Sequence, residues 1–203
     1  MSTIRSICVY CGSSPGRQSL YVEAGKALGR SIAQAGLRLV YGGGTKGIMG
    51  AVADGAMAAG GPVTGIIPRF LMTKERTASD LDRLDELVIT EDMHQRKHMM
   101  FEKSDAFVAL PGGIGTLEEI VEIMTWAQLG RHRKPIVFAN LDGFWNPMTA
   151  LLDHMRAEGF VHTGHLVQPL IVDAVADVVP AIVETARAAA AEAEGDAGVI
   201  GRL

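Results

Sequence analysis

The stretch Asp105-Ala-Phe-Val-Ala-Leu-Pro-Gly-Gly-Ile-Gly-Thr-Leu-Glu-Glu119 reads as a strand, a glycine turn and the start of a helix. Residues 106–110 form a short continuous apolar run, which is typical of a strand buried on both faces of a parallel sheet. Pro111 ends that strand because it has no N–H for the ladder. The three glycines between Pro111 and Thr116 permit positive φ angles and a close approach of the backbone to a ligand.

The residues after the turn predict a helix that packs on the sheet. We expect Thr116 to be its N-cap, with Glu119 three residues later completing a capping box. Four apolar residues fall on one helical face, namely Leu117, Ile120, Val121 and Met124. A helix start at the carboxyl edge of the sheet offers free N–H groups and a partial positive charge, so the stretch predicts an anion site that suits a phosphate group. The alternative is a turn that only caps the helix.

Strand and helix patterns alternate along the whole chain without a linker, which predicts a single doubly wound, mostly parallel, Rossmann-like α/β domain over residues 1–194. We expect residues 195–203 to form a frayed tail. The polar segment 68–85 is a candidate loop over the binding site. The expected strands are 4–10, 37–41, 62–67, 87–90, 106–110, 135–139 and 169–172, and the expected helices are 21–35, 48–59, 91–103, 116 onward, 146–158 and 175–194.

Composition narrows the class of protein. The 203 residues carry a net charge of −4, which argues against a binder of nucleic-acid polymers. The chain starts without a signal-peptide pattern and has no apolar run of membrane-spanning length, so we expect a cytoplasmic protein that does not enter a membrane. Cys8 and Cys11 form a C-x-x-C pattern, but both belong to the first apolar run, and we expect buried strand residues rather than a redox pair.

A second glycine turn follows the second predicted strand. Gly42-x-Gly44-x-x-Gly47 matches the dinucleotide fingerprint, yet it follows the second strand rather than the first, and the next strand ends in Pro68-Arg69 instead of an acid. A phosphate loop of the Walker type is excluded because Gly47, not Ser or Thr, follows Lys46. We interpret the turn, with Gly43 and Gly44, as a second corner beside the same ligand. A tight turn without a ligand is the alternative.

The segment Met93-His-Gln-Arg-Lys-His98 places two cations just before the central strand. A solvated basic face is the alternative for Arg96 and Lys97. His94 and His98 have the i, i+4 spacing of metal ligands, but the Glu of H-E-x-x-H is missing and no third ligand is evident, so we expect no metal. His162 and His165 are weaker candidates still.

Together these segments resemble the Lonely Guy family of cytokinin-activating phosphoribohydrolases, whose members are often mislabelled as lysine decarboxylases. The likeness covers most of the chain in the family's own order. The segments that carry it are Pro111–Glu119, Met93–Lys97, Cys11–Ser14, Tyr41–Gly44, Thr125–Gly130 and Gly143–Asn146.

The resemblance implies hydrolysis of the N-glycosidic bond of an adenine-type nucleoside 5′-monophosphate, without a cofactor. It implies that Arg96 and Glu119 are the catalytic pair. The residues expected to contact the substrate are Ser14, Gly43, Gly44, Glu75, Lys97, Gly113, Ile114, Gly115, Thr116, Leu117, Glu118 and Thr125. The loop around Glu75 differs in length from the family pattern. A homodimer with sites near the subunit interface is also implied.

The chemistry of glycosidic cleavage agrees with this assignment. Positive charge develops at the anomeric carbon, and a nearby carboxylate stabilises it and orients or deprotonates water. Glu118 is the rival of Glu119 for this role. Two other functions stay open at this point: a non-catalytic nucleotide-binding regulatory module, and a pyridoxal-phosphate decarboxylase, for which the sequence offers no Schiff-base lysine motif.

Overall fold

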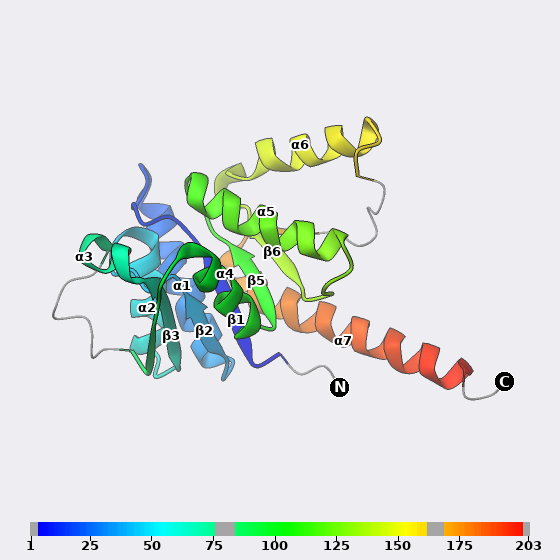
Figure 1. The fold of residues 1–203 in the computed structure, drawn as a ribbon, viewed down its shortest axis with the longest axis horizontal. Coiled ribbons are helices and arrows are strands. Elements are labelled where there is room, and N and C mark those ends of the chain that lie inside the picture. Colours follow the sequence, from blue (N-terminus) through cyan, green and yellow to red (C-terminus); the bar gives the residue numbers. More distant parts are fainter. Residues whose placement is uncertain (1–3, 76–83, 162–168, 201–203) are drawn as a thin grey trace.

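The computed structural model describes residues 4–75, 84–161 and 169–200, with the backbone alone for residue 75 and residues 192–200. Its described strands form one seven-stranded sheet in the order β4-β3-β2-β1-β5-β6-β7 (Figure 1). Every neighbouring pair is parallel. The predicted doubly wound α/β class is therefore confirmed, and the sheet is wholly parallel over these strands.

The elements follow the predicted alternation, with most boundaries moved by one or two residues. The strands are β1 (Ser6–Tyr10), β2 (Arg38–Tyr41), β3 (Val63–Pro68), β4 (Glu86–Thr90), β5 (Ala106–Ala109), β6 (Ile136–Ala139) and β7 (Leu170–Val172). The helices are α1 (Ser19–Gln34), α2 (Gly47–Ala58), α3 (Met72–Glu75), α4 (Met93–Glu102), α5 (Ile114–Gln128), α6 (Asn146–Ala157) and α7 (Val175–Ile200). Short 3-10 helices occupy Arg69–Leu71 and Leu141–Gly143.

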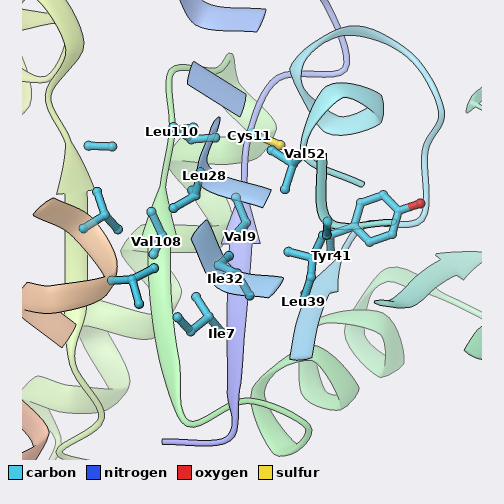
Figure 2. Close-up of a cluster of buried hydrophobic side chains, with 14 of the residues drawn as sticks. Ile7, Val9, Cys11, Leu28, Ile32, Leu39, Tyr41, Val52, Val108 and Leu110 are labelled. Atoms are coloured by element: carbon cyan, nitrogen blue, oxygen red, sulfur yellow. The ribbon is translucent and has the colours of Figure 1, made fainter. Parts of the chain in front are cut away.

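Alternate residues of each strand face opposite sides of the sheet, so the fold has two hydrophobic cores. In β1, Ile7 and Val9 belong to the core under α1, α2 and α7, whereas Cys8 and Tyr10 belong to the core under α4, α5 and α6. Figure 2 shows the first core, where Leu28 of α1 and other apolar side chains pack against the central strands. Both faces are covered, which explains the continuous apolar runs in the sequence.

The last helix differs from the prediction. The backbone of α7 runs through Ile200, past the point near Glu194 where the sequence predicts a frayed tail, and it projects beyond the rest of the fold (Figure 1). The alanine-rich stretch 186–193 favours a helix because alanine has the highest helix propensity, and the helix continues from it through Gly195 and Gly198. Residues 201–203 lie outside the described part of the chain.

Candidate functional site

The sheet reverses its winding between β1 and β5, which puts the topological switch point at the carboxyl ends of these two strands. The loops that follow them are in contact there: the N–H of Gly12 donates to the carbonyl of Pro111 at 3.1 Å. The loop after β1 also contacts the start of α2, because the N–H of Met49 donates to the carbonyl of Gly12 at 3.1 Å. Three segments distant in sequence therefore meet at the position where open parallel sheets bind ligands.

The glycine turn after β5 leads directly into α5, but its details differ from the expectation. The helix begins at Ile114 with Gly113 as its N-cap, so the prediction that Thr116 is the N-cap is wrong. Thr116 is buried within the first turn, because its hydroxyl-bearing side chain packs against Gly112, where an added Cβ would lie 2.1 Å from its Oγ1. None of the three glycines of the turn has a positive φ angle, contrary to the conformation that the sequence suggested. Their lack of a side chain instead allows close packing at Gly112 and leaves the backbone exposed at the other two.

The start of α5 is open to solvent. Gly113, Ile114 and Gly115 are exposed, and Cβ atoms placed on the two glycines would meet nothing within 4 Å. The first intrahelical bond is donated by the N–H of Leu117 to the carbonyl of Gly113 at 3.0 Å. The N–H groups before Leu117 thus point out of the helix start, an arrangement that suits an anion.

Arg96 and Glu119 form a buried ion pair between α4 and α5. Nη1 of Arg96 lies 3.0 Å from Oε1 of Glu119, and the two side chains are only 6% and 9% exposed. The same guanidinium donates from Nε to the carbonyl of Ile66 at 3.1 Å and from Nη2 to the carbonyl of Gly42 at 3.5 Å. The solvated basic face is therefore excluded for Arg96, since a carbonyl after β2, a carbonyl within β3 and a carboxylate on α5 surround its charge.

Lys97 is buried beside this pair, against the side of α5. Its Nζ bonds to Oε1 of Glu118 at 2.5 Å and lies 3.2 Å from Oε1 of Glu122. Burial is the largest single influence on the pKa of Lys97 and lowers it. The hydrogen bonds to Glu118 and Glu122 together outweigh burial, so the net effect is a raised pKa. The Glu118 side chain is 52% exposed and pairs with a different cation from Glu119, so the two neighbouring carboxylates have distinct surroundings. This geometry separates the two rival carboxylates that sequence alone leaves equivalent.

The second glycine turn lies next to Arg96, but its amides are partly used within the protein. The N–H of Gly44 donates to Sδ of Met49 at 3.2 Å, and Gly43 has a positive φ of 78°. Ser14 is exposed. Gly47 packs tightly against the loop that contains Ser14, since a Cβ added to Gly47 would lie 2.6 Å from the carbonyl carbon of Ser14. The turn thus supports the site by packing, while the start of α5 offers the more open amides.

Two predicted contact residues are not placed beside the ion pair. Thr125 is exposed on α5, and its hydroxyl donates to the carbonyl of Val121 at 2.8 Å. The backbone of Glu75 ends α3, and its side chain lies outside the described part of the chain. The segment before it does approach the second glycine turn, since Nζ of Lys46 donates to the carbonyl of Lys74 at 3.0 Å. Val121 is exposed as well, so its predicted place on the packing face of α5 is wrong.

Cys8 and Cys11 are buried, as expected, and both are free thiols. Burial raises the pKa of each thiol far above its ordinary value, and the negative charge of Glu119 raises both further. These thiols are inert at neutral pH, which agrees with a structural role. Among the described residues, no group of three His, Cys, Asp or Glu side chains is arranged to hold a metal ion. His162 and His165 lie outside those residues.

Sequence reasoning missed three contributors to this edge. The carbonyl of Ile66 accepts a hydrogen bond from Arg96, and the sulfur of Met49 accepts one from the neighbouring glycine turn. Glu122 forms an ion pair with Lys97, as Glu118 does. Every residue has a backbone carbonyl, so the sequence cannot show that the carbonyl of Ile66 accepts a hydrogen bond from Arg96. A methionine inside an apolar helix pattern looks the same in sequence as any other core residue. Glu122 did carry a signal, because it stands one helical turn from Glu118.

The fold and this edge define a Rossmann-like α/β protein with its candidate site at the switch point of the sheet. Solved structures share the fold. The molybdenum cofactor binding protein of Rippkaea orientalis superposes with a TM-score of 0.66 at 23% identity, covering 89% of this chain and 96% of that one. A structural-genomics target, TM1055, gives a TM-score of 0.69 at 24% identity, covering 88% and 98%.

Sequence relatives identify the family. Residues 49–182 match a family model described as "Possible lysine decarboxylase". The chain is 47% identical over 160 residues to cytokinin riboside 5'-monophosphate phosphoribohydrolase LOG3 of Arabidopsis thaliana, covering 79% of this chain and 73% of the relative. It is 44% identical over 159 residues to the phosphoribohydrolase of that name in Rhodococcoides fascians, covering 78% and 79%. For the LOG protein of Oryza sativa, at 46% identity, the alignment spans 79% of this chain and 65% of the relative.

The chain therefore belongs to the LOG family of cytokinin riboside 5'-monophosphate phosphoribohydrolases, and the resemblance drawn from its motifs is confirmed. Its relatives are N-glycosidases by name, and the chain is an enzyme of that class. In the part of the chain that the structure describes, no helix combines the length and the apolar character needed to cross a membrane.

Proposed function

We propose that this enzyme hydrolyses the N-glycosidic bond of adenine-type nucleoside 5′-monophosphates, releasing the free base and ribose 5-phosphate. The observation that carries the proposal is the buried Arg96–Glu119 pair, whose carboxylate stands on the helix with the open N-terminus that suits a phosphate. Glu119 lies about 7.5 Å along the axis of α5 from Ile114, at about 1.5 Å per residue. A phosphate at the helix start and a sugar beside the carboxylate fit one bound nucleotide.

The 5′-phosphate binds at the start of α5. The backbone N–H groups there are directed outward, and the aligned peptide dipoles add a partial positive charge. The exposed glycines leave space for the phosphate oxygens to approach the backbone. Binding energy gained on this distant group positions the ribose, which is how a non-reacting part of a substrate contributes to the rate of the chemical step.

The carboxylate of Glu119 then acts on the sugar. As the bond between the anomeric carbon and the base nitrogen breaks, the ribose acquires oxocarbenium character, and a nearby carboxylate stabilises it. The same carboxylate orients a water molecule and accepts its proton as the water attacks the anomeric carbon. Arg96 keeps Glu119 in place, because the guanidinium is itself held by the carbonyls of Ile66 and Gly42.

A homodimer is part of the proposal. The side of α5 that carries Thr125 also exposes Val121, at 38%, and Leu129, at 70%. Exposed apolar residues along one helix stripe are a common feature of subunit interfaces. Thr125 on that stripe fits a site that lies near the interface, in line with its place in the family motif.

The test is release of free base from a panel of nucleoside monophosphates and nucleosides by the purified protein. We expect adenine from AMP and modified adenine from its N6-substituted analogues, and much slower release from adenosine, which lacks the phosphate. Equal turnover of adenosine and AMP would contradict the role of the α5 start.

Substitution of the carboxylate tests the chemical role. Glu119→Gln keeps the size of the side chain and removes the charge, and we expect the rate of base release to fall by about 10²–10⁴-fold. Glu158→Gln, at an exposed position after α6, is the matched control and should behave like the unmodified enzyme. Full activity in the Glu119 variant would remove this residue from the mechanism.

A further inference from the structure

Met49 occupies a position at which the loops of the candidate site converge. It is the third residue of α2 and is 7% exposed. Its backbone N–H donates to the carbonyl of Gly12, after β1, at 3.1 Å. Its sulfur accepts the N–H of Gly44, after β2, at 3.2 Å. One residue therefore joins the two loops through two different atoms.

The sulfur also packs next to the residue that contacts Arg96. A Cβ placed on Gly42 would lie 3.1 Å from Sδ of Met49 on one side and 2.1 Å from Nη2 of Arg96 on another. Gly42 is thus packed closely by both the sulfur and the guanidinium, and its carbonyl lies 3.5 Å from Nη2. A continuous series of contacts runs from Met49 through the second glycine turn to Arg96 and on to Glu119.

The geometry points to Met49 as a positioning residue for the glycosidase reaction: its sulfur fixes the Gly42–Gly44 turn so that the turn holds the guanidinium of Arg96 against Glu119. This inference rests on the proposed function of the Arg96–Glu119 pair. The sulfur supplies a polarizable acceptor for a buried N–H that an aliphatic side chain would leave unpaired. The acceptor, rather than the volume of the side chain, is what distinguishes Met49 from a core residue.

A leucine replacement separates these two properties. Met49→Leu nearly conserves volume, a change that protein cores usually tolerate, but removes the acceptor. We expect kcat for base release from AMP to fall about 10–100-fold, because small displacements of a catalytic group have effects of this size. KM should stay within about twofold, since the phosphate contacts at α5 are untouched. Met57→Leu, on the same helix and half-buried against the same core, is the control and should leave both constants unchanged.

Hydrogen exchange of the Gly44 amide supplies a readout that does not depend on activity. In the Met49→Leu protein this amide should exchange faster than in the unmodified enzyme, and in the Met57→Leu protein it should not. Unchanged kcat in Met49→Leu, an equal loss of kcat in both variants, or an unchanged Gly44 amide would each overturn the inference. If the unmodified enzyme releases no base, the proposed function fails, and the Gly44 amide alone then decides whether Met49 fixes the turn.

Should the leucine variant not fold, Met49→Gln takes its place, because glutamine has an unbranched chain of similar length with an oxygen acceptor. Retention of kcat and of Gly44 amide protection in that variant supports the inference. Loss of both, in a protein that folds, contradicts it.

Discussion

Arg96 has its guanidinium enclosed by four acceptors, and this enclosure makes the site sensitive to changes of a single atom. The acceptors are a carboxylate of α5, a carbonyl that follows β2, a carbonyl within β3 and the sulfur of Met93 on the same helix as Arg96. A buried cation needs such a set because its desolvation cost is high when any partner is missing. The position of the guanidinium is therefore determined by backbone atoms at the sheet edge as much as by Glu119.

Gly42→Ala is the residue-scale prediction that follows. The added methyl group would lie 2.1 Å from Nη2 of Arg96, the mobile end of a long side chain, so the guanidinium moves instead of the backbone. We expect kcat to fall by about 10²-fold, the loss typical of a displacement near 1 Å, and the melting temperature to fall as well, because a buried cation moved away from its acceptors is destabilising. Steady-state kinetics check the expected change in kcat, and thermal melting checks the expected change in stability. A variant with full activity would show that the guanidinium does not need its place beside Gly42.

At this same scale the structure tests how the predicted site residues are held, and several of those details differ from the prediction. The Arg96 and Glu119 positions came from motif resemblance, and the open glycine turn came from elementary backbone chemistry. The capping role of Thr116 was wrong because the tight fit against Gly112 depends on three-dimensional packing that no spacing rule records. The burial of Lys97 was likewise invisible, since its partners Glu118 and Glu122 lie on another helix.

At the scale of elements, α1 and α2 pack unusually closely because small residues line their contact. A Cβ on Gly29 of α1 would lie 2.0 Å from the carbonyl oxygen of Val52, and a Cβ on Gly55 of α2 would lie 2.1 Å from that of Lys26. Both obstructions are backbone atoms of the facing helix, which cannot rotate aside. This close contact between α1 and α2 fixes the position of α2. Through Met49 it also fixes the loops that follow β1 and β2 at the site.

Gly29→Ala should accordingly lower stability. We expect a loss of about 1–3 kcal/mol in the free energy of unfolding, the usual cost of overpacking a core, measured by denaturant titration. A stable Gly29 variant would mean that the two helices separate at no cost, and the account of α2 as a rigid support would be wrong.

The order of elements was readable from the sequence because the inner strands are almost entirely buried and most helices have an apolar stripe. The strand order was not, since parallel pairs form between segments distant in the chain, as β1 and β5 do. The switch point of the sheet, and with it the meeting of the loops after these two strands, follows from that order. The sequence predicted a site at a sheet edge, and the topology shows which loops meet at that edge.

At the scale of the whole molecule, His132 connects three elements, α4, α5 and β5, on the α4–α5 side of the sheet. Its Nδ1 accepts the N–H of Lys134 at 3.1 Å, so Nε2 carries the proton and donates to the carbonyl of Ile123 at 2.9 Å. The ring also packs edge-on against Phe101 and Phe107. These contacts require the neutral imidazole, because protonated Nδ1 has no lone pair for the Lys134 N–H.

This arrangement makes the stability of the fold depend on pH. Burial lowers the pKa of His132, and the nearby charge of Lys134, which itself faces Glu102 and Asp105, lowers it further. A base with a depressed folded-state pKa contributes fully above its unfolded value of about 6.5, and the contribution is lost as the pH falls from there toward the folded pKa. The free energy of unfolding should therefore decrease as the pH falls below about 6.5. In His132→Gln, which has no titrating group at this position, the same fall in pH should produce a shallower decrease, and parallel curves for the two proteins would rule out His132 as the source.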